Sequence, residues 1–137
     1  MKRIVNKIKS YKELKADIVD INLKLQELEE DMLGVSAQPS GERTGATYKI
    51  TSTVEIQAEN YAEKKESLLD AKRKKERELI RIDNALTILK EEEKDIIETV
   101  LIQGKKYSIL EIKYNRTYTR LKQIEEQAIR KMSKYLQ

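Results

Sequence analysis

The chain has 137 residues, 38% of them charged, and a formal net charge of +4 at pH 7. It contains no Cys and no His, which excludes thiol nucleophiles, disulfides and metal sites built from thiolate or imidazole ligands. Since general acid–base chemistry is left to Asp, Glu and Lys, we expect no enzyme, no catalytic residue and no cofactor.

The first predicted helix carries apolar residues at alternating steps of three and four: Tyr11, Leu14, Ile18, Ile21, Leu25, Leu28 and Met32. This spacing is a heptad seam over three heptads. Ser10 is a plausible N-cap, although Ile4 and Ile8 indicate an earlier start. We expect the helix to end near Gly34.

Residues 34–51 contain three of the four glycines and the only proline, and they predict a flexible loop. A second long helix is expected from Ser52 or Thr53. Its seam holds Val54, Ala58, Tyr61, Leu68, Leu79, Ile82, Leu86 and Leu89, interrupted by Lys65, Lys72 and Lys75. The two helices can pair as an antiparallel hairpin or with the same helices of another chain. We assign residues 1–89 to oligomerisation or partner binding.

A third helix is predicted from Lys90 to Ile102, with Gly104 ending it. Its apolar side is formed by Ile96, Ile97, Val100 and Leu101. Glu91, Glu92, Glu93 and Asp95 lie in its first turns, where acids favour the positive end of the helix dipole. A metal cluster is the alternative interpretation, but consecutive residues of a helix point to different faces, so we predict no metal site.

Residues 107–132 are typical of a helix-turn-helix. Apolar side chains recur at Leu110, Tyr114, Leu121, Ile124, Ala128 and Ile129. Asn115 tolerates the left-handed conformation of a tight turn, and Thr117 can cap the following helix.

Positive charge is concentrated in the same part of the chain. Residues 105–137 hold nine Lys or Arg and three acids, a net charge of +6, which leaves −2 for the rest. A basic segment that coincides with a helix-turn-helix pattern indicates a polyanion partner. The alternative is an ordinary solvated charged surface.

The segment from Ala85 to Leu121 resembles the C-terminal promoter-reading domain, region four, of bacterial sigma factors. The positions in register without a gap are Gly104, Tyr107, Leu110, Tyr114, Asn115, Leu121, Ala128 and Ile129. The whole chain resembles the phage late-transcription activators of the RinA and ArpU type, through the sequence YKEL at 11–14 and GVSAQ at 34–38. Two positions depart from the family pattern: Glu111 replaces a small residue, and Arg116 replaces an aliphatic one.

The pattern and the resemblance together imply an all-α fold. A long N-terminal helical hairpin or coiled coil would precede a compact helix-turn-helix domain at 90–137 that binds double-stranded DNA. With Leu121 and Ile124 in the core, the N-terminal end of the second helix would present Tyr118, Thr119, Arg120 and Gln123 to the bases. The expected phosphate contacts, which fix register only, are Lys105, Lys106, Lys113, Arg116 and Lys122. Each of these residues could equally be an ordinary exposed side chain.

The leading hypothesis is a phage-type transcription regulator, a late-gene activator that binds promoter DNA. Its N-terminal helices would form homo-oligomers or contact bacterial RNA polymerase. A small terminase-like DNA-packaging subunit and a coiled-coil adaptor without a nucleic-acid role are the alternatives. No segment approaches the roughly 20 apolar residues of a membrane span, and no signal core follows the basic N-terminus. We therefore expect the cytoplasm of a bacterial host cell and no membrane partner.

Overall fold

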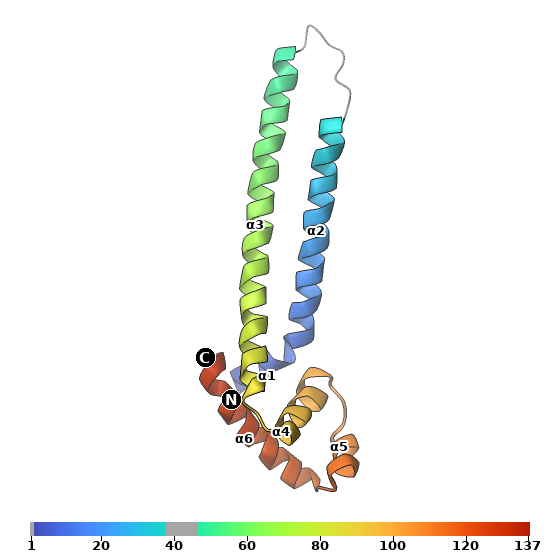
Figure 1. Cartoon of the computed structure of the whole chain (residues 1–137), viewed down its shortest axis with the longest axis vertical. Coiled ribbons are helices and arrows are strands. Elements are labelled where there is room, and N and C mark those ends of the chain that lie inside the picture. The colour runs from blue at the N-terminus through green and yellow to red at the C-terminus, as the bar shows by residue number, and fades with distance from the viewer. Residues whose placement is uncertain (1, 38–46) are drawn as a thin grey trace. The chain divides into compact units, whose positions relative to one another are not determined.

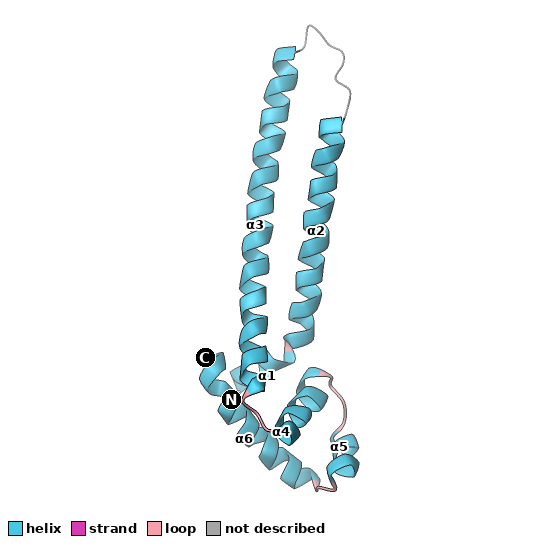
Figure 2. Cartoon of the chain, in the orientation of Figure 1, coloured by secondary structure: helices cyan, strands magenta, loops and turns pink. Residues whose placement is uncertain are grey.

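The computed structural model describes residues 2–37 and 47–137, and these residues form helices and connecting turns without any strand. The all-α prediction is therefore confirmed (Figures 1 and 2). The elements are α1 (Lys2–Lys9), α2 (Tyr11–Ala37), α3 (Thr47–Thr87), α4 (Glu91–Ile96), the π-helix η1 (Ile97–Ile102), α5 (Tyr107–Tyr114) and α6 (Tyr118–Leu136). They form two compact units: residues 1–16 with 75–137, and residues 17–74.

Ser10 separates two helices at the N-terminal end. Its N–H donates to the carbonyl oxygens of Asn6 and Lys7, at 3.1 and 3.2 Å, and its hydroxyl donates to that of Lys7, at 2.6 Å. The next helix begins at Tyr11, and the N–H of Leu14 donates to the Ser10 carbonyl oxygen at 2.8 Å. The expected earlier start is thus a separate short helix, α1.

The predicted bounds of the loop were wrong at both ends. Helix α2 continues through Gly34 to Ala37, and α3 begins at Thr47 rather than at Ser52 or Thr53. A glycine inside a helix costs only about 1 kcal/mol, whereas the residue before a proline is strongly disfavoured in the α conformation. Pro39 therefore explains the end of α2 better than Gly34 does. The rest of the predicted loop, residues 38–46, lies outside the described residues.

In the unit of residues 17–74, α2 and α3 run antiparallel and side by side (Figure 1). Leu28 and Met32 line one surface hollow with Tyr61 of α3, and Leu28 lines another with Leu68. The heptad seam of α2 thus pairs with α3 of the same chain. The opposite face of α2 exposes Val19 and Leu23, at 58% and 52%.

The core of the other unit is assembled from distant parts of the chain, and Leu14 of α2 and Leu89 belong to it as well. Its other buried residues are Ile4 and Ile8 of α1, Ile82, Ala85 and Leu86 at the end of α3, Ile97 and Leu101 of η1, and Ala128, Ile129, Met132 and Leu136 of α6. Full burial of one such aliphatic side chain stabilises a fold by roughly 1.5–3 kcal/mol. The segment 90–137, expected as a domain of its own, therefore shares its core with residues from 1–16 and 75–89.

The predicted third helix is present but changes type halfway. After α4 the chain continues as η1, closed by a bond from the N–H of Gln103 to the carbonyl oxygen of Glu98, at 2.8 Å. Gly104 then takes a φ of +70°, a conformation that glycine adopts without strain. The N–H of Lys105 donates back to the Thr99 carbonyl oxygen, at 2.9 Å, so the chain turns sharply toward α5.

Candidate nucleic-acid interface

The turn between α5 and α6 has the local geometry predicted for it. Asn115 is left-handed, with φ 51° and ψ 48°, and its N–H donates to the carbonyl oxygen of Glu111. Thr117 is the N-cap of α6, and its hydroxyl accepts from the N–H of Arg120 at 3.2 Å. The predicted roles of Asn115 and Thr117 in this turn are confirmed.

A small core lies beneath the turn. Leu110 of α5, Leu121 and Ile124 of α6 and Ile96 of α4 are buried together, with Tyr107 and Tyr114 packed against them. Because these side chains come from α4, α5 and α6, their packing sets the orientation of the first turn of α6 relative to the other two helices.

A polar pair inside this region joins α5 to α6. The hydroxyl of Tyr107 donates to Oε2 of Glu125, whose side chain is buried. Burial and this hydrogen bond raise the pKa of Tyr107 well above its ordinary value, so the phenol remains a donor. The ring of Tyr107 also meets Tyr118 edge to face, with centroids 5.0 Å apart, and lies 5.3 Å from the ammonium of Lys122.

The four residues predicted to contact bases all lie on the surface of the first two turns of α6. Thr119, Arg120 and Gln123 are exposed, and Tyr118 is 50% exposed beside Tyr107. A guanidinium N–H of Arg120 donates to Oε1 of Gln123 at 3.3 Å, so these two side chains are presented together.

The five predicted phosphate contacts divide into two groups. Lys105, Lys106 and Lys122 are exposed, and within the described residues no carboxylate lies within ion-pair distance of them. Lys113 and Arg116 are also exposed but paired. Nζ of Lys113 is 2.6 Å from Oδ2 of Asp95, and Nε of Arg116 is 2.7 Å from Oε1 of Glu92. A DNA phosphate would have to compete with these acids.

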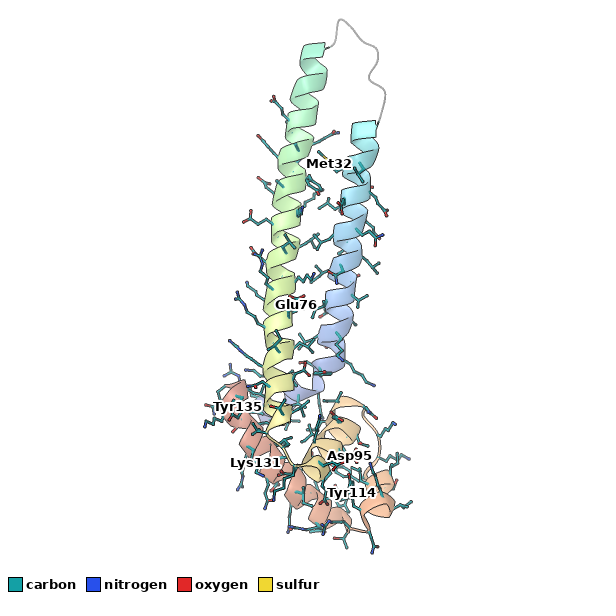
Figure 3. The ribbon with its side chains drawn as sticks, viewed as in Figure 1. Met32, Glu76, Asp95, Tyr114, Lys131 and Tyr135 are labelled. Atoms are coloured by element: carbon teal, nitrogen blue, oxygen red, sulfur yellow. The ribbon has the colours of Figure 1, made fainter. Side chains whose placement is uncertain are left out.

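Asp95 is the centre of the bonds that join α4 to α5. It accepts from Lys113 at 2.6 Å, from the Tyr114 hydroxyl at 2.5 Å and from the Thr99 hydroxyl at 3.2 Å (Figure 3 labels Asp95 and Tyr114). The bonds from Lys113 and Tyr114 lower the pKa of Asp95, against the opposing effect of burial. The carboxylate therefore stays ionised and holds α5 in place.

The neighbouring acid Glu93 faces a different helix. Burial opposes its ionisation, but hydrogen bonds from the Lys90 N–H and the Lys131 ammonium, each at 3.0 Å, lower its pKa overall. Glu92, Glu93 and Asp95 thus bind three different cations, Arg116, Lys131 and Lys113. Among the described residues no group of three or more acids is arranged to hold a metal ion.

Sequence reasoning missed two features of this surface. It did not anticipate that Glu92 and Asp95 would hold Arg116 and Lys113, which are 24 and 18 residues away. It also expected helix before Ser10 only as an extension of the first long helix, and did not anticipate that the separate basic helix α1 packs against α6 and η1. The spacing of Ile4 and Ile8 among basic residues was the available signal for a short helix with one buried face.

Comparison of the chain with models of protein families, with curated proteins and with solved structures found no match. No helix in the described part of the chain combines the length and the apolar composition that crossing a membrane requires.

Proposed function

We propose that this chain is a phage-type transcription regulator that binds promoter DNA through the first turns of α6. The observation that carries the proposal is the exposed set Tyr118, Thr119, Arg120 and Gln123 at the start of that helix. This set follows the left-handed turn at Asn115 and lies above the small core that α4, α5 and α6 form. In helix-turn-helix proteins the N-terminal residues of the second helix enter the major groove.

The division of charge between the two units supports a polyanionic partner. Residues 1–16 and 75–137 together hold twenty Lys or Arg and twelve acids, a net charge of +8. Residues 17–74 hold eight basic and twelve acidic residues, a net charge of −4. The basic unit attracts the negatively charged DNA backbone, whereas the acidic unit is repelled by it and is better suited to contacts with proteins.

The chemistry of α6 suggests which bases are read. Arginine can bind guanine with two hydrogen bonds and glutamine can bind adenine in the same way, each pair discriminating by roughly 1–3 kcal/mol. The hydrogen bond between Arg120 and Gln123 holds both side chains in one place, so we expect them to read adjacent base pairs. Lys105, Lys106 and Lys122 would bind phosphates and fix the register.

The hairpin of α2 and α3 would then mediate association with a second copy or with bacterial RNA polymerase, in the host cytoplasm. The exposed Val19 and Leu23 would also suit the oligomerisation helices of a small terminase-like packaging subunit. Light scattering separates these roles: a monomer or dimer is expected for a regulator, and a ring of eight or more chains would favour packaging.

Selection of bound sequences from random duplex DNA tests the proposal. We expect the wild-type chain to enrich a defined sequence, and R120A/Q123A to lose that enrichment while still binding DNA at low salt. The matched control is Q57A/R77A, which removes the same residue types from exposed positions on α3 and is expected to change nothing. Failure of the wild-type chain to bind any duplex at low salt would contradict the proposal and leave the adaptor role.

A further inference from the structure

The short helix α1 carries four cations and no acid: Lys2, Arg3, Lys7 and Lys9. Its apolar residues Ile4 and Ile8 are buried against η1 and α6. Because these two residues occupy one face, Lys2, Arg3 and Lys9 are left exposed on the other faces. Figure 1 shows α1 beside α6, close to the C-terminal end.

The cations of α1 have different surroundings. The ammonium of Lys7 donates to the carbonyl oxygen of Leu136 at 2.6 Å, at the end of α6 where the helix dipole favours a positive charge. Lys9 instead lines a surface hollow that also contains Tyr107 and Lys122. In the described part of the chain no acid forms an ion pair with Lys2, Arg3 or Lys9.

The acids of the hollow leave the two lysines available. Glu125 is buried and bonded to Tyr107, and Glu126 is exposed without an ion pair among the described side chains. Lys9 therefore belongs to the same flank of the unit as Lys122, one of the expected phosphate contacts. Residues 1–16 as a whole hold six Lys or Arg and one Glu, which is most of the excess positive charge of their unit.

We infer that α1 is a second phosphate-binding element. It contacts the DNA backbone through Arg3 and Lys9, next to the stretch of major groove that α6 is proposed to enter. The inference rests on the proposed DNA-binding function and extends its interface to the other end of the chain. Contacts to phosphates add affinity and salt dependence but no sequence information. An acidic protein segment is the competing partner. DNA is favoured because Lys9 lies on the flank of Lys122.

The test compares two double variants that each remove two positive charges from residues 1–16. R3Q/K9Q removes the proposed contacts, and K12Q/K15Q removes exposed lysines of α2 as the matched control. Each protein is titrated with the duplex that the wild-type chain selects, at several salt concentrations between about 50 and 200 mM. The logarithm of the affinity falls linearly with the logarithm of the salt concentration, with a slope near −0.9 per neutralised phosphate. We expect the slope for R3Q/K9Q to be shallower than the wild-type slope by about 1.8, and the slope for K12Q/K15Q to equal the wild-type slope.

Circular dichroism melts accompany the titration, and both variants are expected to melt like the wild-type chain because the substituted side chains are exposed. Selection with R3Q/K9Q is expected to return the wild-type sequence. Equal slopes for R3Q/K9Q and its control would overturn the inference, and so would a changed selected sequence. If R3Q/K9Q keeps the DNA slope but loses binding to polyglutamate, α1 binds an acidic protein instead. Binding of the wild-type chain is measured before any variant is compared. If the wild-type chain binds no duplex, the proposed function itself is rejected.

Discussion

Arg116 and Glu92 join the turn between α5 and α6 to the first turn of α4, with Nε of the arginine 2.7 Å and Nη2 3.4 Å from the two carboxylate oxygens. The ion pair therefore engages one of the cations that were expected to bind phosphate.

Glu92→Gln is expected to strengthen DNA binding. Removing the carboxylate frees Arg116 for a phosphate, which would make the slope of log affinity against log salt steeper by about 0.9. Both side chains are partly exposed and screened by solvent, so the loss of folding stability should be small. Titrations at several salt concentrations measure the slope, with Glu91→Gln as a control for the general change in charge. Identical slopes for the two variants would show that Arg116 does not reach the DNA.

Tyr107→Phe is expected to destabilise the unit by about 1–3 kcal/mol, because the buried Glu125 carboxylate loses its hydroxyl donor. The double variant Y107F/E125M removes both polar groups and should recover part of this loss. Urea denaturation of the single and double variants measures the free energies of unfolding. Additive losses in the double variant would mean that the two residues do not depend on each other.

Asp95 makes the stability of the unit depend on acid pH. Its folded-state pKa is lowered from an ordinary value of 3.8, so the ionised carboxylate stabilises the fold above about pH 4. This contribution is lost as the pH falls through the lowered pKa. We expect the difference in melting temperature between the wild-type chain and Asp95→Asn to be full at pH 6 and to shrink toward about pH 3. The exposed Asp20→Asn serves as control, and a pH-independent difference for Asp95→Asn would refute this account.

Ile8→Ala is expected to destabilise the unit formed by residues 1–16 and 75–137 by about 2–5 kcal/mol, since Ile8 is fully buried in its core. Val19→Ala, at an exposed position, should have almost no effect. Chemical denaturation followed by circular dichroism measures both. A fragment of residues 90–137 is expected to remain largely unfolded, and a cooperative melt of that fragment would contradict the shared core.

Much of the fold could be predicted from local patterns. The heptad seam of α2, the third helix with Gly104 at its end, and the turn at Asn115 and Thr117 depend on residues close together in the sequence. The position of α1 could not be predicted in the same way, because an eight-residue helix gains its stability from packing on distant helices.

The candidate interface was predictable only as a set of residue types on one surface. The exposure of Thr119, Arg120 and Gln123 follows from the spacing of Leu121 and Ile124. Which cations remain available is a tertiary property, since it depends on where α4 places Glu92 and Asp95. Charge counts along the sequence therefore overestimated the free positive charge near the turn.

The sharing of one core between α1 and α6 has a consequence for synthesis of the chain. Lys7 and Leu136 are 129 positions apart, and Ile8 packs in the cluster that also contains Met132. A ribosome adds roughly 5–20 residues per second, so α1 emerges many residues before the helix that covers it. The antiparallel pair of α2 and α3 can assemble during this interval, whereas the basic unit closes only after α6 has been released. Until then Ile4 and Ile8 lack the cover that α6 provides, which leaves this side of α1 open to chaperones and proteases during translation.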